Sequence, residues 1–183
     1  REVEVNRPTH VFVQAGVGSL AGGVVGYFAN LYPNNPPKFI VMEAGAADCL
    51  YKGAEAGDGE PRIVGGDLQT IMAGLACGEP NTIGWDILRN HVSAFISCPD
   101  WVSAKGMRML AAPVKGDPSV TSGESGAVGM GVISSIMTDD AYKELREALE
   151  LDNSSQVLMF STEGDTDPDK YKKIVWGGEY PTV

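Results

Sequence analysis

The stretch that most constrains the fold is residues 11–28, "VFVQAGVGSLAGGVVGYF", an apolar run that ends at a glycine-rich turn and restarts as a helix of small residues. Glycine lets the backbone of such a turn open without a Cβ clash. The helix that follows directs free N–H groups and the positive end of its dipole toward the turn. The pattern therefore predicts a site for a phosphate group.

Composition narrows the class of ligand. The chain has 183 residues, of which 43% are hydrophobic and 21% are charged, and this is enough to bury one globular core. Its net charge of -10 excludes a surface for nucleic acid or for an anionic membrane, since both are polyanions. No apolar run approaches the roughly 18 residues of a membrane span. We expect a small soluble ligand.

The cysteines and histidines do not form a metal-binding pattern. Cys49, Cys77 and Cys98 are an odd number without metal-ligand spacing, and we interpret Cys77 as a small buried thiol. His10 enters an apolar run and His91 ends a predicted helix, so both are given structural roles. The sequence therefore predicts no metal, and a cytoplasmic protein with reduced thiols.

Apolar periodicity and turn residues predict alternating strands and helices. Strands are expected at residues 9–14, 38–42, 93–98 and 156–160, and helices at 19–31, 48–56, 82–91, 100–112, 122–137 and 138–151. Residues 62–64 are at most a short strand, 68–75 are weakly helical, and Thr138 is the expected cap of the last helix. The alternation predicts an α/β fold with three layers, in which helices flank an open, mostly parallel sheet.

The glycine-rich turn also fits a dinucleotide site. Gly16, Gly18 and Ala21 match the G-x-G-x-x-G/A spacing, and Glu43 follows the next strand, where an acid that binds ribose is expected. An NAD(P)-dependent oxidoreductase is therefore one alternative. Glycines that serve only close packing of the helix against the strand are another.

Three segments in order along the chain favour a different cofactor: "QAGVGSLAGG" at 14–23, "SGESGAVGMG" at 122–131 and "FSTEGDTDPDKY" at 160–171. Together they resemble the pyridoxal-phosphate enzymes of the tryptophan synthase β fold, also called fold type II. The likeness is strongest to the diaminopropionate ammonia-lyases of that family. It implies α,β-elimination that converts 2,3-diaminopropionate to pyruvate and two ammonia. A related ammonia-lyase, such as a serine/threonine dehydratase, is the alternative within the family.

The resemblance assigns the glycine-rich turn to the phosphate of pyridoxal 5'-phosphate. Carried over residue by residue, the phosphate-binding loop consists of Ala15, Gly16, Val17, Gly18 and Ser19. Successive N–H groups in an open turn bind a phosphate without a nearby lysine or arginine. This loop is the first part of the predicted cofactor site.

The resemblance places Ser161 or Thr162 beside the pyridine nitrogen of the cofactor, and Glu124 near its ring. A hydroxyl does not keep the pyridine nitrogen protonated as a carboxylate would, and this suits β-elimination. The residues alone leave other roles open. The hydroxyls could cap the end of a strand, and Glu124 could interact only with a helix dipole.

The resemblance also implies that a lysine forms the Schiff base with the cofactor and moves protons at Cα. No lysine of this chain stands in the family's lysine context; they occupy positions 38, 52, 105, 115, 143, 170, 172 and 173. We therefore expect residues 1–183 to be the C-terminal part of the cofactor-binding domain, inactive alone. The full protein is expected to act on a small amino acid as a homodimer.

Overall fold

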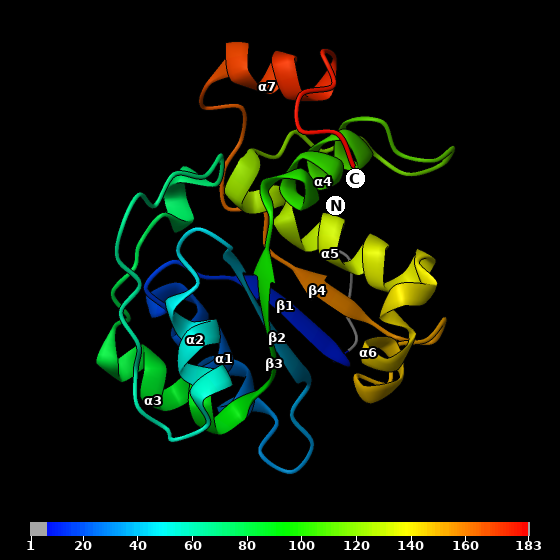
Figure 1. The fold of residues 1–183 in the computed structure, drawn as a ribbon. Helices are drawn as coiled ribbons and strands as arrows, with labels where there is room; N and C mark the ends of the chain where they lie inside the picture. Colours follow the sequence, from blue (N-terminus) through cyan, green and yellow to red (C-terminus); the bar gives the residue numbers. More distant parts are fainter. Residues whose placement is uncertain (1–6, 183) are drawn as a thin grey trace.

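The computed structural model describes residues 7–182 and contains one parallel sheet (Figure 1). Its strands are β1 (His10–Gln14), β2 (Lys38–Ala44), β3 (Val92–Cys98) and β4 (Val157–Met159), in the order β3-β2-β1-β4. All three pairings are parallel, and Phe12 of β1 lies opposite Ile40 on one side and Met159 on the other. The predicted parallel sheet is confirmed.

Helices cover both faces of the sheet and complete the predicted three layers (Figure 1). One face carries α1 (Ser19–Leu31), α2 (Cys49–Ala56) and α3 (Thr82–His91); the other carries α4 (Asp100–Ala111), α5 (Glu124–Thr138) and α6 (Lys143–Ala148), with α7 (Pro168–Val175) against α4. Short 3-10 helices occupy Ala73–Leu75 and Asp140–Tyr142. Within residues 7–182, every helix is too short or too polar to span a bilayer.

The central strands are apolar on both faces because each face is covered. Val11 and Val13 pack on the side of α1 to α3, whereas Phe12 packs on the side of α4 and α5, and all three are fully buried. Successive side chains of a strand point to opposite faces, so a strand covered on both sides reads as one continuous apolar run. This explains why residues 11–13 show no polar alternation.

Helices α4 and α5 are in backbone contact. Gly106 of α4 faces the carbonyl of Ala127, and Gly131 of α5 faces the carbonyl of Val102. A Cβ atom at either glycine would overlap the facing carbonyl oxygen. The small residues of the segment 122–131 therefore let the two helices approach closely, and they fix the start of α5 relative to the sheet.

The prediction of one helix over residues 138–151 is wrong. Asp139 has an extended backbone and accepts a hydrogen bond from the N–H of Ala141 at 2.9 Å, which starts a separate 3-10 turn before α6. Thr138 is instead the last residue of α5, and its hydroxyl donates to the carbonyl of Ser134 at 2.8 Å. The cap is thus one residue later than expected, and it divides the segment.

Other differences concern weakly patterned segments. Residues 62–64 form no strand, and within 68–75 only a 3-10 turn appears. Strand β4 is shorter than predicted and only half buried. Helix α7 was not expected at all: Asp167 caps it by accepting from the N–H of Lys170 at 3.1 Å, and Ile174 is its buried residue.

Candidate cofactor-binding site

A cavity of about 350 Å³ opens at the carboxyl ends of β1 and β4. It is lined by Gln14, Ala15, Gly16, Val17, Gly18, Ser19, Leu20, Gly74, Leu75, Cys77, Ser125, Thr162 and Glu163. In open parallel sheets this edge is where ligands bind. The cavity brings together the whole predicted phosphate-binding loop and one of the two hydroxyls predicted beside the cofactor ring.

The phosphate-binding loop presents an uncapped helix N-terminus. Gly18 is the N-cap of α1, with φ of 91° in the left-handed region, and no described side chain caps this helix. The N–H groups of its first turn have no partner within the helix. Gly18 is also packed between Leu50 and Leu88, which a Cβ atom would approach to 3.3 Å and 3.2 Å. The loop therefore needs glycine here, and it offers donors to an anion.

Segment 72–81, "MAGLACGEPN", braces the loop from outside. The N–H of Asn81 donates to the carbonyl of Val17 at 2.8 Å, and its side chain caps α3 by accepting from the N–H of Gly84 at 2.7 Å. On the other side, the N–H of Ala15 donates to the carbonyl of Met42 at 2.8 Å. The loop is thus held by α3 and by β2, and the N–H groups of residues 16–19 donate to no backbone acceptor among the described residues.

The two hydroxyls predicted beside the cofactor ring, those of Ser161 and Thr162, differ in their position relative to the cavity. Thr162 lines the cavity, and its Oγ1 accepts a hydrogen bond from Gln14 Nε2 at 2.9 Å. Ser161 is not among the lining residues, and its hydroxyl donates to that of Ser122 at 2.9 Å. Of the two candidates, Thr162 faces the space next to the phosphate-binding loop.

Glu163 supports the wall of the cavity that contains Thr162, a role that the sequence analysis missed. Its Oε1 accepts from the N–H groups of Ser125 at 2.5 Å and Gly126 at 3.3 Å, so the carboxylate caps α5. The carbonyl of Glu163 accepts from the N–H of Gly123 at 3.0 Å. The segment after β4 is therefore joined to the start of α5. The Glu directly after the Ser-Thr pair was the available signal.

Ser125 supplies a donor without a partner. It is 4% exposed, lines the cavity, and holds the one buried side-chain oxygen or nitrogen without a hydrogen-bond partner among the described residues. Buried hydroxyls are normally paired, and leaving one unpaired is costly. An unpaired hydroxyl beside an uncapped helix N-terminus fits a ligand that carries acceptor oxygens, as a phosphorylated cofactor does.

Glu124 lies next to the cavity but is not one of its lining residues. Its Oε1 forms an ion pair with Lys170 Nζ at 3.3 Å, and the same ammonium donates to the carbonyl of Ile71 at 3.3 Å. The Glu124 carboxylate is therefore paired with the Lys170 ammonium. Its contact with the ring stays a prediction.

Glu43 contradicts the dinucleotide alternative. It is fully buried and absent from the cavity lining, and its two oxygens accept from the N–H groups of Leu50 at 2.9 Å and Tyr51 at 2.6 Å. Burial raises the pKa of the Glu43 carboxyl from 4.5 to about 8, although the two backbone donors act in the opposite direction. The Glu43 carboxyl is hydrogen-bonded to the start of α2 and is not available to bind a ribose. The interpretation of the glycine-rich turn as a dinucleotide site is therefore wrong.

The thiols are free, and their positions differ from expectation. Cys77 is exposed and lines the cavity, so its interpretation as a buried thiol is wrong. Burial raises the pKa values of Cys49 and Cys98 to about 12, which keeps both thiols neutral.

No group of three or more His, Cys, Asp or Glu side chains within residues 7–182 is placed to hold a metal ion. His10 is structural, since its Nε2 is 2.7 Å from the carbonyl oxygen of Leu149.

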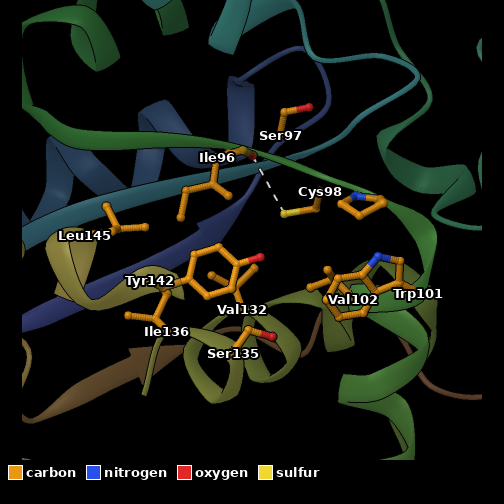
Figure 2. A pocket seen from close by; sticks show the side chains of 11 residues that line it. Ile96, Ser97, Cys98, Trp101, Val102, Val132, Ser135, Ile136, Tyr142 and Leu145 are labelled. Atoms are coloured by element: carbon orange, nitrogen blue, oxygen red, sulfur yellow. Dashed lines mark hydrogen bonds between the residues drawn. The ribbon is translucent and has the colours of Figure 1, made fainter. Parts of the chain in front are cut away.

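A second cavity lies between β3, α4 and α5, and it is smaller, at about 120 Å³ (Figure 2). Figure 2 shows Ile96, Val132 and Ile136 gathered around the ring of Tyr142. The hydroxyl of Ser135 in its lining already accepts from Lys105 Nζ at 3.1 Å. This apolar cavity lacks the row of free donors found at the phosphate-binding loop.

Comparison with known proteins identifies the family of this chain. A family model described as "Pyridoxal-phosphate dependent enzyme" matches residues 1–163. Diaminopropionate ammonia-lyase from Salmonella typhimurium is 54% identical over 172 residues, which are 93% of this chain and 43% of that protein. The chain spans less than half the length of this relative.

Solved structures show the same fold. The crystal structure of diaminopropionate ammonia lyase from Escherichia coli in complex with a reaction intermediate matches with a TM-score of 0.86 at 48% identity, over 97% of this chain and 44% of that chain. Maize serine racemase matches with a TM-score of 0.69 over 93% of this chain and 48% of that one, and at 20% identity it supports the fold alone. The expected fold class is confirmed, and the chain belongs to the pyridoxal-phosphate dependent enzymes.

Proposed function

We propose that residues 1–183 are the C-terminal part of the cofactor-binding domain of a diaminopropionate ammonia-lyase. The observation that carries the proposal is the cavity in which an uncapped glycine loop and the unpaired hydroxyl of Ser125 face the same space. The 54% identity to diaminopropionate ammonia-lyase from Salmonella typhimurium supports the substrate, and the family supports pyridoxal 5'-phosphate as the cofactor. The full enzyme would release pyruvate and two ammonia from 2,3-diaminopropionate.

The lining residues divide the cavity into two ends. The N–H groups of Gly16, Gly18 and Ser19 would hold the phosphate, with the α1 dipole behind them. Thr162 would stand beside the ring nitrogen, and Glu163 keeps that wall joined to α5. When bound, the cofactor withdraws electrons from the Cα of an amino-acid substrate and so makes its proton removable.

The proton transfer itself is assigned elsewhere in the protein. A base that moves a proton at Cα must lie within hydrogen-bond reach of it. All eight lysines of the sequence lie within residues 7–182, which the structure describes, and none of them lines the cavity. The relatives are more than twice as long as the matched region. We therefore assign binding of the phosphate and support of the ring to this chain, and the Schiff-base lysine to another part of the polypeptide.

The substrate, the assembly and the location of the full protein belong to the same proposal. A small amino acid is the proposed substrate, and 2,3-diaminopropionate is preferred over serine and threonine because of the relatives named above. The homodimer and the cytoplasmic location stay predictions. A serine/threonine dehydratase is the competing activity that the assay must separate.

The test is pyruvate release by the natural polypeptide that contains residues 1–183, with and without added pyridoxal 5'-phosphate. We expect release from 2,3-diaminopropionate that requires the cofactor and exceeds release from serine or threonine. The 183-residue chain alone should bind the cofactor and release no pyruvate. Release from serine or threonine only would identify a dehydratase instead, and absence of cofactor binding by the natural polypeptide would refute the proposal.

A further inference from the structure

Gln14 is a buried polar residue in an otherwise apolar strand. It ends β1 directly before the phosphate-binding loop and is only 2% exposed. Its amide nitrogen donates to the carbonyl of Phe160 at 2.8 Å and to Thr162 Oγ1 at 2.9 Å. Burying an amide in this way is favourable only when its hydrogen bonds are made. Gln14 therefore joins the end of β1 to the segment that follows β4.

The two acceptors fix which way each hydrogen bond runs. The carbonyl of Phe160 only accepts, so the NH₂ end of the Gln14 amide must face it. The NH₂ group has two hydrogens, and the second is directed to Thr162 Oγ1. Thr162 is thus an acceptor toward Gln14. A hydroxyl that accepts on one side still has its own hydrogen to donate on another.

The hydroxyl hydrogen of Thr162 is available to a group bound in the cavity. Among the described residues, the Thr162 hydroxyl donates to no protein acceptor, and Thr162 lines the cavity. The one carboxylate in the lining, Glu163, already accepts from the N–H groups of Ser125 and Gly126. Glu163 makes both of these bonds through Oε1, and among the described residues no hydrogen bond joins it to Thr162. The Thr162 hydrogen is therefore left for an acceptor on a bound group.

We infer that Gln14 is a positioning residue, which turns the Thr162 hydroxyl so that its hydrogen is offered to an unprotonated ring nitrogen of the bound cofactor. The inference rests on the proposed function, which supplies the ring. It assigns the choice between the two hydroxyls to Thr162, and it gives the buried amide of Gln14 a task beyond joining two strands. Without the Gln14 donor, the hydroxyl would be free to turn and accept instead.

The test compares two probes: pyridoxal 5'-phosphate and its 1-deaza analogue, in which a C–H replaces the ring nitrogen. Dissociation constants are measured by titration of the apo form of the natural polypeptide that contains this chain. A neutral hydrogen bond corresponds to roughly a fivefold preference for the probe that carries the nitrogen. We expect Gln14→Glu to abolish this preference, because a carboxylate accepts the Thr162 hydrogen. Thr162→Val should abolish it as well, and Thr162→Ser should retain it.

Gln156→Glu is the matched control, since Gln156 is exposed and precedes β4 at its far end; this variant should keep the preference. If Gln14 had a purely structural role, its substitution would weaken the binding of both probes equally and leave the ratio of their dissociation constants unchanged. This result would overturn the inference. If Gln14→Glu does not fold, the result for Thr162→Val decides, because equal loss of both probes would again overturn it. Wild type that binds both probes equally refutes the inference alone, whereas wild type that binds neither refutes the proposed function too.

Discussion

Ser125 and Ser103 are buried serines that differ in one respect. The hydroxyl of Ser103 donates to the carbonyl of Glu124, whereas that of Ser125 has no partner in the described part of the chain. We predict that Ser125→Ala raises the free energy of unfolding of the ligand-free chain by about 1 kcal/mol, because it removes an unpaired polar group. Ser103→Ala should lower it by about the same amount, since it leaves a buried carbonyl without its donor.

The same Ser125→Ala variant should weaken binding of pyridoxal 5'-phosphate about fivefold, the value of one neutral hydrogen bond. Urea titration of both variants and fluorescence titration with the cofactor measure the two effects. A gain in stability with a loss in affinity is the signature of a binding residue. A loss in both quantities would show that Ser125 is instead a structural residue.

Some residues of this site are predictable from sequence, and others are not. Gly16, Gly18 and Ser19 follow from a local pattern, because a strand, a glycine turn and a helix N-terminus are contiguous. Gln14 has its role only through Thr162, which is 148 positions away in the chain. A contact of that separation depends on the order of the strands, which local periodicity does not specify. Ser125 was missed for the same reason.

Helix α5 illustrates how elements are constrained by close approach. Gly131→Ala or Gly106→Ala would place a Cβ atom onto a carbonyl oxygen of the facing helix, and we predict a loss of about 3 kcal/mol in the free energy of unfolding for each. Gly23→Ala is the control, because a Cβ atom at that position of α1 would meet no atom within 4 Å apart from its chain neighbours and the backbone of its own helix. It should raise the free energy of unfolding by about 1 kcal/mol through helix propensity.

Thermal or urea denaturation of the three variants checks these signs. Losses of similar size at Gly23 and at the two contact glycines would mean that backbone contact between α4 and α5 is not what makes them necessary. The expected opposite signs separate helix propensity from packing.

At the level of elements, prediction succeeded where local signals were strong. Helix α3 begins where Asn81 provides a side-chain cap and ends at the expected residue, and α1 has the predicted bounds. The prediction of one helix over residues 138–151 failed because the apolar periodicity continues across Asp139. Asp139 caps a separate 3-10 turn and so divides the segment. Helix α7 was missed because its sequence is mostly polar and its packing depends on α4.

At the level of the whole molecule, the buried carboxyl of Glu43 links folding to pH. Its pKa is raised to about 8 in the folded chain from 4.5, chiefly by burial, so the folded state binds more protons than the unfolded state between these values. The free energy of unfolding should therefore fall as the pH rises through this window. The slope has an upper limit of about 1.4 kcal/mol per pH unit.

Glu43→Gln removes the titrating group and should abolish this fall, even if it lowers stability overall by weakening the cap of α2. Glu55→Gln, at an exposed position on the same helix, should keep the wild-type slope. Urea titrations at pH 5, 6, 7 and 8 measure it. Parallel curves for wild type and Glu43→Gln would show that Glu43 keeps an ordinary pKa.

The bracing of the phosphate-binding loop has a kinetic consequence. The carbonyl of Val17 accepts from the N–H of Asn81, the N–H of Ala15 donates to the carbonyl of Met42, and the carbonyl of Gly18 accepts from the N–H of Gly22, so the protein itself holds the loop. A loop that is already ordered loses little conformational entropy when it binds. The rate of association at this loop is then limited by encounter and orientation rather than by rearrangement of the backbone.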